Sequence, residues 1–461
     1  MSTLTADPTP RGGTQRLEET VVEAVRLARE LGASGSEATA AEGEEFSADV
    51  RLGEIERVKE SGSRGVGIRV LFGKRIGSSY TSDFSPEGLR AMVAQAVDLA
   101  RITTEDPFVG LPDPSQLGKL EGNLSIYYPD VPALSAADKI ERARRAEKAA
   151  LDHDPRITNS DGGSFGSHVS RQAFANSLGF CGSYQTTSCS LSVAPVAQFD
   201  GRMERDYWYT VSREAARLED PESVGRKAAE RVLLRLNPRK IETCKAAVIF
   251  EPRVARTLVG HVFELASGDA IYRKASSWHD RLGQTVAAPS LTVIDDATLP
   301  GLFGTSPFDD EGVPSRRTPV IENGVLENYL LNTYTGRKLG MPTTGNASRG
   351  LTGNAGVGHG NLFIEKGSAS PEELMRQAGS GLLVMQLLGF GFNPVTGDYS
   401  RGATGLWFED GRIAYPVSEV TIAGNFKDML TNVAGLGNDL EFQGSVAAPT
   451  IWIREMTISG R

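Results

Sequence analysis

The chain holds five histidines, and one of them, His261, lies in a segment with clear helical periodicity. Glu264 follows three positions later, which places both side chains on one face of that helix. A histidine and a carboxylate so placed supply part of a metal site, but they need further ligands from elsewhere in the chain. The HExxH pattern of zinc hydrolases is absent. The simpler interpretation is a buried or half-buried histidine whose ring nitrogens are satisfied by a hydrogen bond.

A second group of reactive side chains is acidic. Asp309, Asp310 and Glu311 follow one another and precede Arg316 and Arg317. Neighbouring carboxylates repel one another unless something compensates their charge. The pattern fits a solvated turn as well as it fits a site for a cation, a peptide amine or the two arginines. The sequence leaves both interpretations open.

Other catalytic signatures are weak or absent. The sequence has no G-x-S-x-G elbow and no G-x-x-x-x-G-K-[ST] phosphate loop. Cys181, Cys189 and Cys244 have no activating neighbour in sequence and are predicted to be buried, inert thiols. The glycine-rich segments 353–360 and 389–393 do not lead closely into a helix. They therefore favour tight turns near a site over a phosphate cradle.

Composition narrows the class of protein. The formal net charge of -9 argues against nucleic acid or an anionic membrane as a partner, because both require a basic patch. No apolar run reaches the roughly 18 residues of a membrane span, and the first residues lack the apolar region of a secretory signal. An odd number of cysteines suits a reducing compartment. We predict a cytoplasmic protein with a disordered lead over 1–15.

The reactive side chains must be positioned by the surrounding elements, and the first half of the chain alternates helices with strands. Apolar spacing predicts helices over 17–31, 86–101, 135–152 and 223–236. Alternating apolar residues predict strands around 46–50 and 66–70. Several short strands are expected between 157 and 211, with a turn at Asp161-Gly162-Gly163.

Helices become scarce beyond Pro238. A buried strand over 246–250 leads into the helix that carries His261, predicted over 252–267. Only 371–378 and 423–434 also have a helical pattern, and the rest fits short strands joined by turns such as Asn323-Gly324 and Asp410-Gly411. The predicted fold class is α+β. An α/β N-terminal domain over 16–237 precedes a β-rich C-terminal domain over 238–461 with few helices.

A set of specific segments in the second half follows a recognisable order and spacing. They are 268–274 (GDAIYRK), 305–312 (TSPFDDEG), 321–326 (IENGVL), 330–340 (LLNTYTGRKLG), 344–347 (TGNA), 424–426 (GNF), 437–441 (GNDLE) and 458–460 (ISG). In these segments the chain resembles the TldD/PmbA family, and within it the PmbA branch, also called TldE. The resemblance extends over roughly residues 17 to 461 and is looser in the N-terminal part, where it rests on 62–70 and the flanking helices.

The resemblance implies a heterodimeric, cytoplasmic zinc peptidase that cleaves unfolded, flexible or modified peptides. In such complexes the TldD-type subunit carries zinc on an HExxxH helix, with a cysteine ligand near its C-terminus. The PmbA-type subunit has no complete site. An older label for the family is modulator of DNA gyrase.

Matching the HExxxH pattern to this chain places its three functional positions at Arg256, Thr257 and His261. Arginine has no lone pair to give to zinc, and threonine cannot act as the base that a glutamate provides. No cysteine follows Cys244. The resemblance therefore implies a non-catalytic subunit that holds no metal, with zinc in its TldD-type partner. Arg256 and His261 are candidate substrate-binding residues, since a cation can hold a substrate carboxylate. Strand edges and glycine-rich loops can hold a peptide by main-chain pairing.

Two alternatives stay open from the sequence. The first alternative to the subunit role is a self-sufficient metal-dependent hydrolase, built on His261 with Glu264, Asp309 or Glu311. The second is a regulatory protein that binds DNA gyrase. The acidic net charge limits the second alternative to protein contact. The sequence also leaves open whether the chain forms a homodimer, and it does not identify the peptide substrate.

Overall fold

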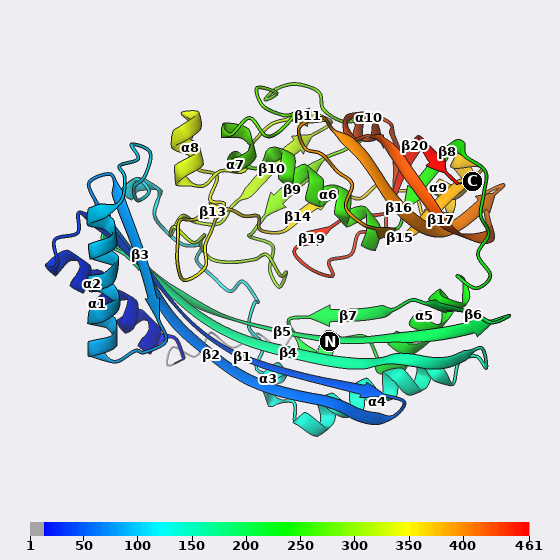
Figure 1. The fold of residues 1–461 in the computed structure, drawn as a ribbon, viewed down its shortest axis with the longest axis horizontal. Coiled ribbons are helices and arrows are strands. Elements are labelled where there is room, and N and C mark those ends of the chain that lie inside the picture. Colours follow the sequence, from blue (N-terminus) through cyan, green and yellow to red (C-terminus); the bar gives the residue numbers. More distant parts are fainter. Residues whose placement is uncertain (1–12, 461) are drawn as a thin grey trace.

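The computed structural model describes residues 13–460, so most of the predicted disordered lead, 1–15, lies outside the described residues. The first half of the chain forms one long seven-stranded sheet. The second half forms sheets of five and six strands and a two-stranded pair (Figure 1). This mixture of helices and sheets confirms the predicted α+β class. No helix within residues 13–460 combines the length and the apolar character needed to cross a membrane.

The first half contains the long sheet and the helices that cover it. Its main elements are α1 (Gln15–Glu30), β1 (Gly35–Arg51), β2 (Glu54–Phe72), β3 (Arg75–Thr81), α2 (Pro86–Ile102), α3 (Asp130–Ala133), α4 (Ala136–Leu151), β4 (Ile157–Asn176), β5 (Cys181–Phe199), β6 (Arg202–Arg205), β7 (Trp208–Ser212) and α5 (Pro221–Leu233). The strand order is β3-β2-β1-β4-β5-β6, and β7 also pairs with β5.

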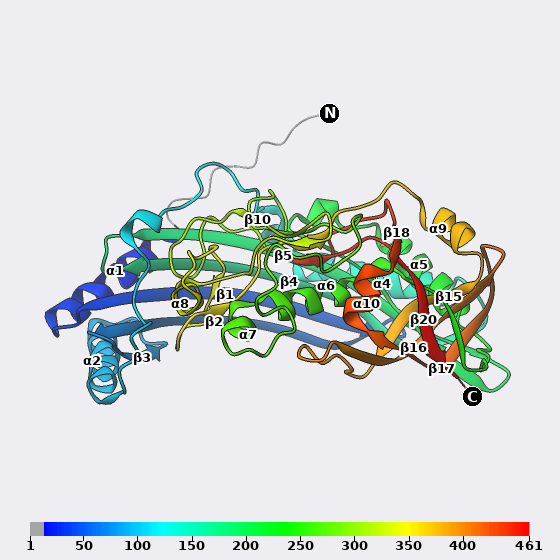
Figure 2. The ribbon, with the colours of Figure 1, turned by 90° about the horizontal axis from the view of Figure 1, so that it is seen from above.

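The helices pack on one face of this sheet. Leu17 of α1 and Val93 of α2 share a core with Ile68 of β2, and Ala146 of α4 packs with Leu191 of β5. Figure 1 shows the long strands curving, with the second half of the chain on the concave side. Seen from above in Figure 2, α1 and α2 lie at one end of the sheet.

The segment between 157 and 211 differs from the sequence prediction. Only β6 and β7 are short strands there, whereas β4 and β5 run for 20 and 19 residues. The predicted turn at Asp161-Gly162-Gly163 is a bulge inside β4, where the register with β5 shifts between Ser160 and Gly163. Gly162 has a φ of +113°, a conformation that glycine adopts without strain. The same residue types favour a reversing turn and a bulge, so only the pairing with β1 and β5 distinguishes the two.

The second half contains shorter elements. They are β8 (Cys244–Phe250), α6 (Pro252–Ala266), α7 (Gly268–Tyr272), β9 (Val293–Asp296), β10 (Arg317–Glu322), β11 (Val325–Leu326), α8 (Thr333–Leu339), β12 (Ala347–Ser348), β13 (Gly356–Val357), β14 (Leu362–Ile364), α9 (Pro371–Ala378), β15 (Gly381–Leu388), β16 (Asp398–Glu409), β17 (Arg412–Asn425), α10 (Phe426–Thr431), β18 (Val433–Leu436), β19 (Val446–Ala447) and β20 (Ile451–Ser459). The six-stranded sheet has the order β17-β16-β15-β8-β20-β18, and the five-stranded sheet β11-β10-β9-β14-β19.

Helix α6 lies between these two sheets. Its buried face shares one core with Phe250 of β8 and Val384 of β15 from the six-stranded sheet, and with Val293 of β9 and Leu362 of β14 from the five-stranded sheet. Contact on both sides fixes the rotation of the helix, because turning it would expose apolar residues on one side or the other. The direction of each polar side chain on α6 is consequently fixed by the packing of its apolar face.

Local signals set many limits in this half. The hairpin turns at Asn323-Gly324 and Asp410-Gly411 join β10 to β11 and β16 to β17, as predicted. Helix α9 has the predicted limits, 371–378. The helix predicted over 423–434 is present but shorter, because β17 continues to Asn425, β18 starts at Val433, and only α10 is helical between them. Strand pairing with β16 and β20 takes precedence there over the helical spacing.

The two halves meet through buried ion pairs. Glu37 of β1 is completely buried and lies 2.8 Å from Arg69 Nε of β2. It also pairs with Arg349, which follows β12. Arg349 Nη2 donates to Thr39 Oγ1 at 3.0 Å. One side chain from the second half thus packs on the face of the first half's sheet, against residues of β1 and the ring of Phe174 in β4.

Candidate functional site

Helix α6 positions the residues that the sequence analysis selected. Pro252 occupies its first turn, where a missing N–H has no cost. Glu251, just before the helix, is held by Arg231 of α5 through two hydrogen bonds of 2.9 Å each. The start of α6 is therefore tied to the first half of the chain, and Arg256 and Thr257 face the junction between the halves.

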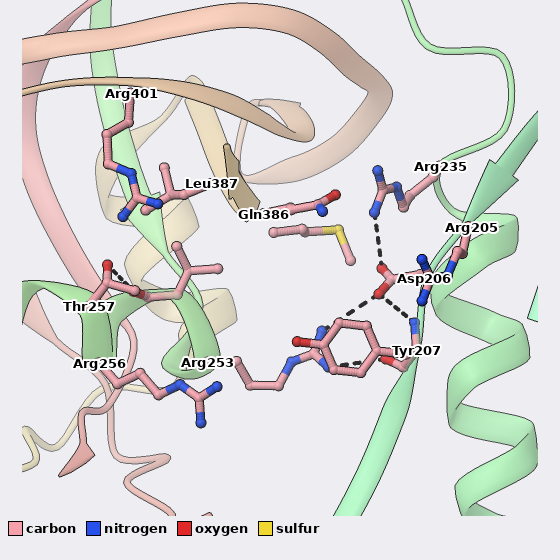
Figure 3. Close-up of a pocket in the computed structure, with 12 residues that line it drawn as sticks. Arg205, Asp206, Tyr207, Arg235, Arg253, Arg256, Thr257, Gln386, Leu387 and Arg401 are labelled. Carbon is pink, nitrogen blue, oxygen red and sulfur yellow. Dashed lines mark hydrogen bonds and ion pairs between the residues drawn. The ribbon is translucent and has the colours of Figure 1, made fainter. Parts of the chain in front are cut away.

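A cavity of about 330 Å³ opens at this junction, and we call it the arginine cavity (Figure 3). Its walls come from the β6–β7 connection, the end of α5, α6, β15 and β16. The lining residues are Arg205, Asp206, Tyr207, Arg235, Arg253, Val254, Arg256, Thr257, Met385, Gln386, Leu387 and Arg401. Five arginines and a single acidic residue give the cavity a positive charge.

Asp206 compensates part of that charge. It is 4% exposed and lies 3.7 Å from Arg235 and 3.8 Å from Arg253. Tyr207 donates its backbone N–H to Asp206 Oδ1 at 2.7 Å, and Arg253 also lies over the Tyr207 ring, 4.7 Å from its centroid. Arg205 pairs with Asp161 of β4 at 2.6 Å. These three arginines consequently have acidic partners.

Arg256 and Arg401 have neutral partners instead. Arg256 Nη1 donates to Tyr209 Oη of β7 at 2.9 Å, and Arg401 Nη2 donates to the Gly389 carbonyl at 2.7 Å. Across residues 13–460, no carboxylate lies within 4 Å of either guanidinium. In Figure 3 no dashed line reaches either side chain, whereas Asp206 is joined to Arg235 and Arg253. Neither guanidinium forms an ion pair within 4 Å in the described residues, although Arg256 also lines a neighbouring cavity together with Glu251, Asp439 and Glu441.

His261 lies elsewhere on α6 and does not line the arginine cavity. Its ring packs against Phe392 at 4.2 Å between centroids and against Phe426 at 5.7 Å. Nδ1 is 3.5 Å from Glu264 Oε1, so the predicted pair are neighbours. Neither ring nitrogen makes a hydrogen bond, contrary to the satisfied histidine that the sequence favoured. Aromatic packing holds the ring in place instead.

The donor atoms around α6 do not suit zinc. Arg256 is a hydrogen-bond donor without a free lone pair, and Thr257 Oγ1 donates to the Val254 carbonyl at 2.7 Å. His261 is enclosed by rings. In the described part of the chain, no three His, Cys, Asp or Glu side chains are grouped to hold a metal ion. We therefore assign no metal-dependent step to these residues.

The acidic segment is neither solvated nor paired with the following arginines. Asp309 is 7% exposed and Glu311 is 2% exposed. The Asp309 carboxylate accepts backbone N–H groups of Glu311, Val313 and Ala347 at 2.9–3.0 Å. Burial, together with the nearby charge of Glu311, raises the pKa of Asp309 to about 8. The solvated-turn interpretation is wrong, because the segment folds back on itself and buries its carboxylates.

The rest of this segment joins the two halves. Asp310 accepts from Gln172 Nε2 of β4 at 3.2 Å and from the Arg349 backbone N–H at 2.7 Å. Glu311 accepts from the Thr333 N–H at the start of α8 at 2.9 Å. Arg317, predicted as a partner, lies instead 3.9 Å from Glu365. These contacts give the acidic segment a structural place at the junction.

The cysteines differ in burial. Cys189 is buried and Cys244 is half-buried, but Cys181 is exposed at the first position of β5. The prediction of buried thiols is wrong for Cys181, because a strand end leaves the side chain uncovered. Burial raises the pKa of Cys189 to about 12. No cysteine lines the arginine cavity.

Sequence reasoning identified Arg256 but missed its companions in the cavity. Asp206 and Arg401 lie far from α6 in sequence, and neither belongs to a pattern with a known function. Only Pro252-Arg253 is a local signal for the cavity, since the proline marks the start of α6 and the arginine places a cation beside that start. The convergence of charges from β6, α5, α6 and β16 has no counterpart in local sequence.

Comparison with known families gives matches along most of the chain. Family models described as PmbA/TldA metallopeptidase domain 1, central domain and C-terminal domain match residues 37–100, 129–236 and 243–460. The chain is 40% identical to metalloprotease PmbA of Escherichia coli O157:H7, over 96% of both chains. It is 38% identical to the metalloprotease PmbA homolog of Haemophilus influenzae, over 97% of this chain and 96% of that protein.

Solved structures show the same fold. A candidate modulator of DNA gyrase from Bacteroides thetaiotaomicron superposes with a TM-score of 0.90 at 26% identity, covering 97% of this chain and 100% of that one. TldE from Thermococcus kodakarensis superposes with a TM-score of 0.83 at 22% identity, over 95% of this chain and 99% of that one.

Proposed function

This chain belongs to the PmbA/TldD metallopeptidase family, and from that premise we propose that it is the PmbA/TldE-type subunit of a two-protein zinc peptidase. In this proposal the TldD-type partner holds the zinc and performs hydrolysis in the cytoplasm. This chain assembles with the partner and binds unfolded or modified peptides. It holds no zinc and contacts neither nucleic acid nor membrane.

One observation carries the non-catalytic assignment. The helix that corresponds to the family's metal helix presents Arg256 and Thr257 where a zinc peptidase needs a ligand and a base. The guanidinium of Arg256 is bonded to Tyr209, and the hydroxyl of Thr257 is bonded within its own helix. Both groups act as donors, whereas zinc and a metal-bound water require acceptors.

Peptide binding is supported by the surroundings of Arg256. Strand β7, which supplies Tyr209, pairs only with β5 among the described strands, so its other edge has no strand partner. A free edge accepts an extended peptide through main-chain hydrogen bonds and tolerates many sequences. Arg256 is the residue that we propose to contact substrate. His261, also a candidate from sequence, acts in this proposal by packing the aromatic rings behind α6.

Zinc analysis combined with peptidase assays tests the proposal. The chain, its TldD-type partner from the same organism, and the co-expressed complex are purified and analysed for zinc and for cleavage of unfolded peptides. We expect zinc in the partner and the complex, little in this chain alone, and cleavage that requires the complex. Stoichiometric zinc with cleavage by this chain alone would contradict the proposal and support the self-sufficient hydrolase.

The same preparations test assembly. Size-exclusion chromatography with light scattering distinguishes a heterodimer with the TldD-type protein from a homodimer of this chain. A pull-down from the native cytoplasm that recovers gyrase and no TldD-type protein would instead favour a regulatory role.

A further inference from the structure

We propose that the arginine cavity is a carboxylate-binding subsite for peptides, in which the positive wall supplied by Arg256 and Arg401 attracts and binds the anion. This inference rests on the proposed peptide-binding function and adds the chemical group that the site selects. The shared chemistry is a carboxylate, which a peptide supplies either at its C-terminus or on an Asp or Glu side chain.

The charges in the cavity favour an anion as its ligand. Arg205, Arg235 and Arg253 have acidic partners. Arg256 and Arg401 have none within 4 Å in the described residues, and arginine stays charged at all ordinary pH values. A pocket wall with five arginines and one carboxylate, in which two arginines form no ion pair, attracts an anion. This attraction is stronger where the cavity excludes water.

Both guanidinium groups also keep N–H donors whose hydrogen bonds a carboxylate can accept. One Nη atom of Arg256 is bonded to Tyr209 and one of Arg401 to the Gly389 carbonyl, each at normal distance. These bonds orient both side chains and leave further N–H donors available. Arg401 Nε is buried and has no hydrogen-bond partner. Planar guanidinium groups bind carboxylates through paired N–H donors, which makes them more selective than isolated charges.

The size and walls of the cavity also suit a peptide carboxylate. A volume of about 330 Å³ accommodates more than a single ion, so a side chain or a chain end can enter with its carboxylate. Val254, Met385 and Leu387 supply apolar walls, and such walls strengthen charge pairing by lowering the local dielectric. The nearby free edge of β7 can align the rest of the peptide.

A set of four labelled peptides tests the proposal by fluorescence anisotropy with the full chain. The probe is a short, unstructured Gly/Ser-rich peptide that carries either one Glu or one Gln, with a free or an amidated C-terminus. We expect the peptide without any carboxylate to bind weakest. Arg256→Ala or Arg401→Ala should weaken binding of the preferred peptide about tenfold to a hundredfold, the range for losing a hydrogen bond to a charged group.

The comparison of peptides identifies the source of the carboxylate. Amidation abolishes the preference if the C-terminus is held, whereas Glu→Gln abolishes it if a side chain is held. Arg281→Ala is the matched control, because the exposed Arg281 side chain donates to Gln284 Oε1 outside the cavity and forms no ion pair within 4 Å in the described residues. This variant removes the same charge and should leave peptide affinity unchanged.

Three binding results would overturn the inference. They are equal affinity for all four peptides, no measurable binding of any peptide, or equal losses in Arg256→Ala and Arg281→Ala. Circular dichroism confirms that each variant folds, and Arg256→Lys, which keeps the charge and loses the paired donors, should bind with intermediate affinity. A complex that cleaves all four peptides equally rejects the carboxylate subsite and leaves the proposed subunit role intact.

Discussion

Two neighbouring side chains on α6, Arg256 and Thr257, carry the proposal that this chain does not hold the zinc. Arg256 and Thr257 both donate hydrogen bonds, the first to Tyr209 and the second to the Val254 carbonyl. The guanidinium of Arg256, at the position of the first histidine in the HExxxH pattern, repels a zinc ion and attracts a carboxylate. In the proposed function, the residue that cannot bind a metal is therefore the one that binds substrate.

Thiol reactivity is predictable residue by residue. Cys189 is 1% exposed and burial raises its pKa to about 12, so little thiolate is present near neutral pH. Cys181 is exposed, although partial burial and the charge of Glu18 raise its pKa too. With iodoacetamide at about pH 8, a value near the ordinary cysteine pKa, we expect Cys181 to be modified first and Cys189 only after unfolding. Peptide mass spectrometry measures this order, and early modification of Cys189 would contradict it.

At the scale of elements, strand β2 is shaped to receive a loop of the second half. A Cβ added at Gly67 would lie 1.6 Å from the carbonyl oxygen of Leu351. Backbone cannot move aside as a flexible side chain can, so the absence of a side chain at Gly67 allows the loop to dock. The contact explains a glycine inside a strand, where glycine is otherwise unfavourable.

Gly67→Ala should displace that loop from the sheet. We expect a loss of about 1–3 kcal/mol in the free energy of unfolding, typical of overpacking, with faster hydrogen exchange around residues 349–353. Gly62→Ala is the matched control in the same strand, since the nearest atom to its added Cβ is 4.0 Å away. Urea denaturation and hydrogen exchange measure both variants. Equal stability of the two variants would show that the loop at Leu351 docks without needing a glycine at position 67.

At the scale of the whole molecule, buried charges hold the two halves together. Glu37 of β1 pairs with Arg69 and with Arg349, and all three side chains are at most 5% exposed. Burial alone raises the pKa of Glu37, but the charges of Arg69 and Arg349 outweigh burial and hold it below its usual value. The ionised form is therefore the one that the folded chain stabilises.

This sign fixes how the pairs respond to acid. Because the folded pKa is below the unfolded value of about 4.3, the stabilisation is present above that pH and is lost as the pH falls through the folded pKa. Glu37→Gln should cost about 3–5 kcal/mol at neutral pH, since it leaves buried arginines without their partner. The difference from the natural chain should shrink below about pH 4.

Urea denaturation as a function of pH measures this difference. Glu44→Gln is the matched control, because Glu44 lies on the same strand and pairs with Arg171 at 2.7 Å but is 61% exposed. Exposed pairs contribute at most about 1 kcal/mol. A cost for Glu37→Gln that matches the control, or that does not vary with pH, would contradict the prediction.

Local sequence predicted the elements whose signals are short-range. The helix start at Pro252, the limits of α9 and the turn at Asn323-Gly324 follow from caps, spacing and turn residues that act within a few positions. The bulge at Gly162 and the short α10 did not follow, because distant strands chose between two conformations that the local residues allow. The acidic segment was ambiguous for the same reason, since its partners Gln172 and Arg349 are remote in sequence.

The sequence by itself determined the α+β class and the membership of a metallopeptidase family, because composition, spacing and motifs are properties of residues in order. It also placed Arg256 and Thr257, which are not metal ligands, at the positions that match the family's metal motif. Only the tertiary structure decided that Arg256 shares a cavity with Arg401 and Asp206 while His261 does not. The physical reason is that α6 is held between two sheets. Burial of its apolar face sets its rotation, and that rotation directs each polar side chain to its surroundings.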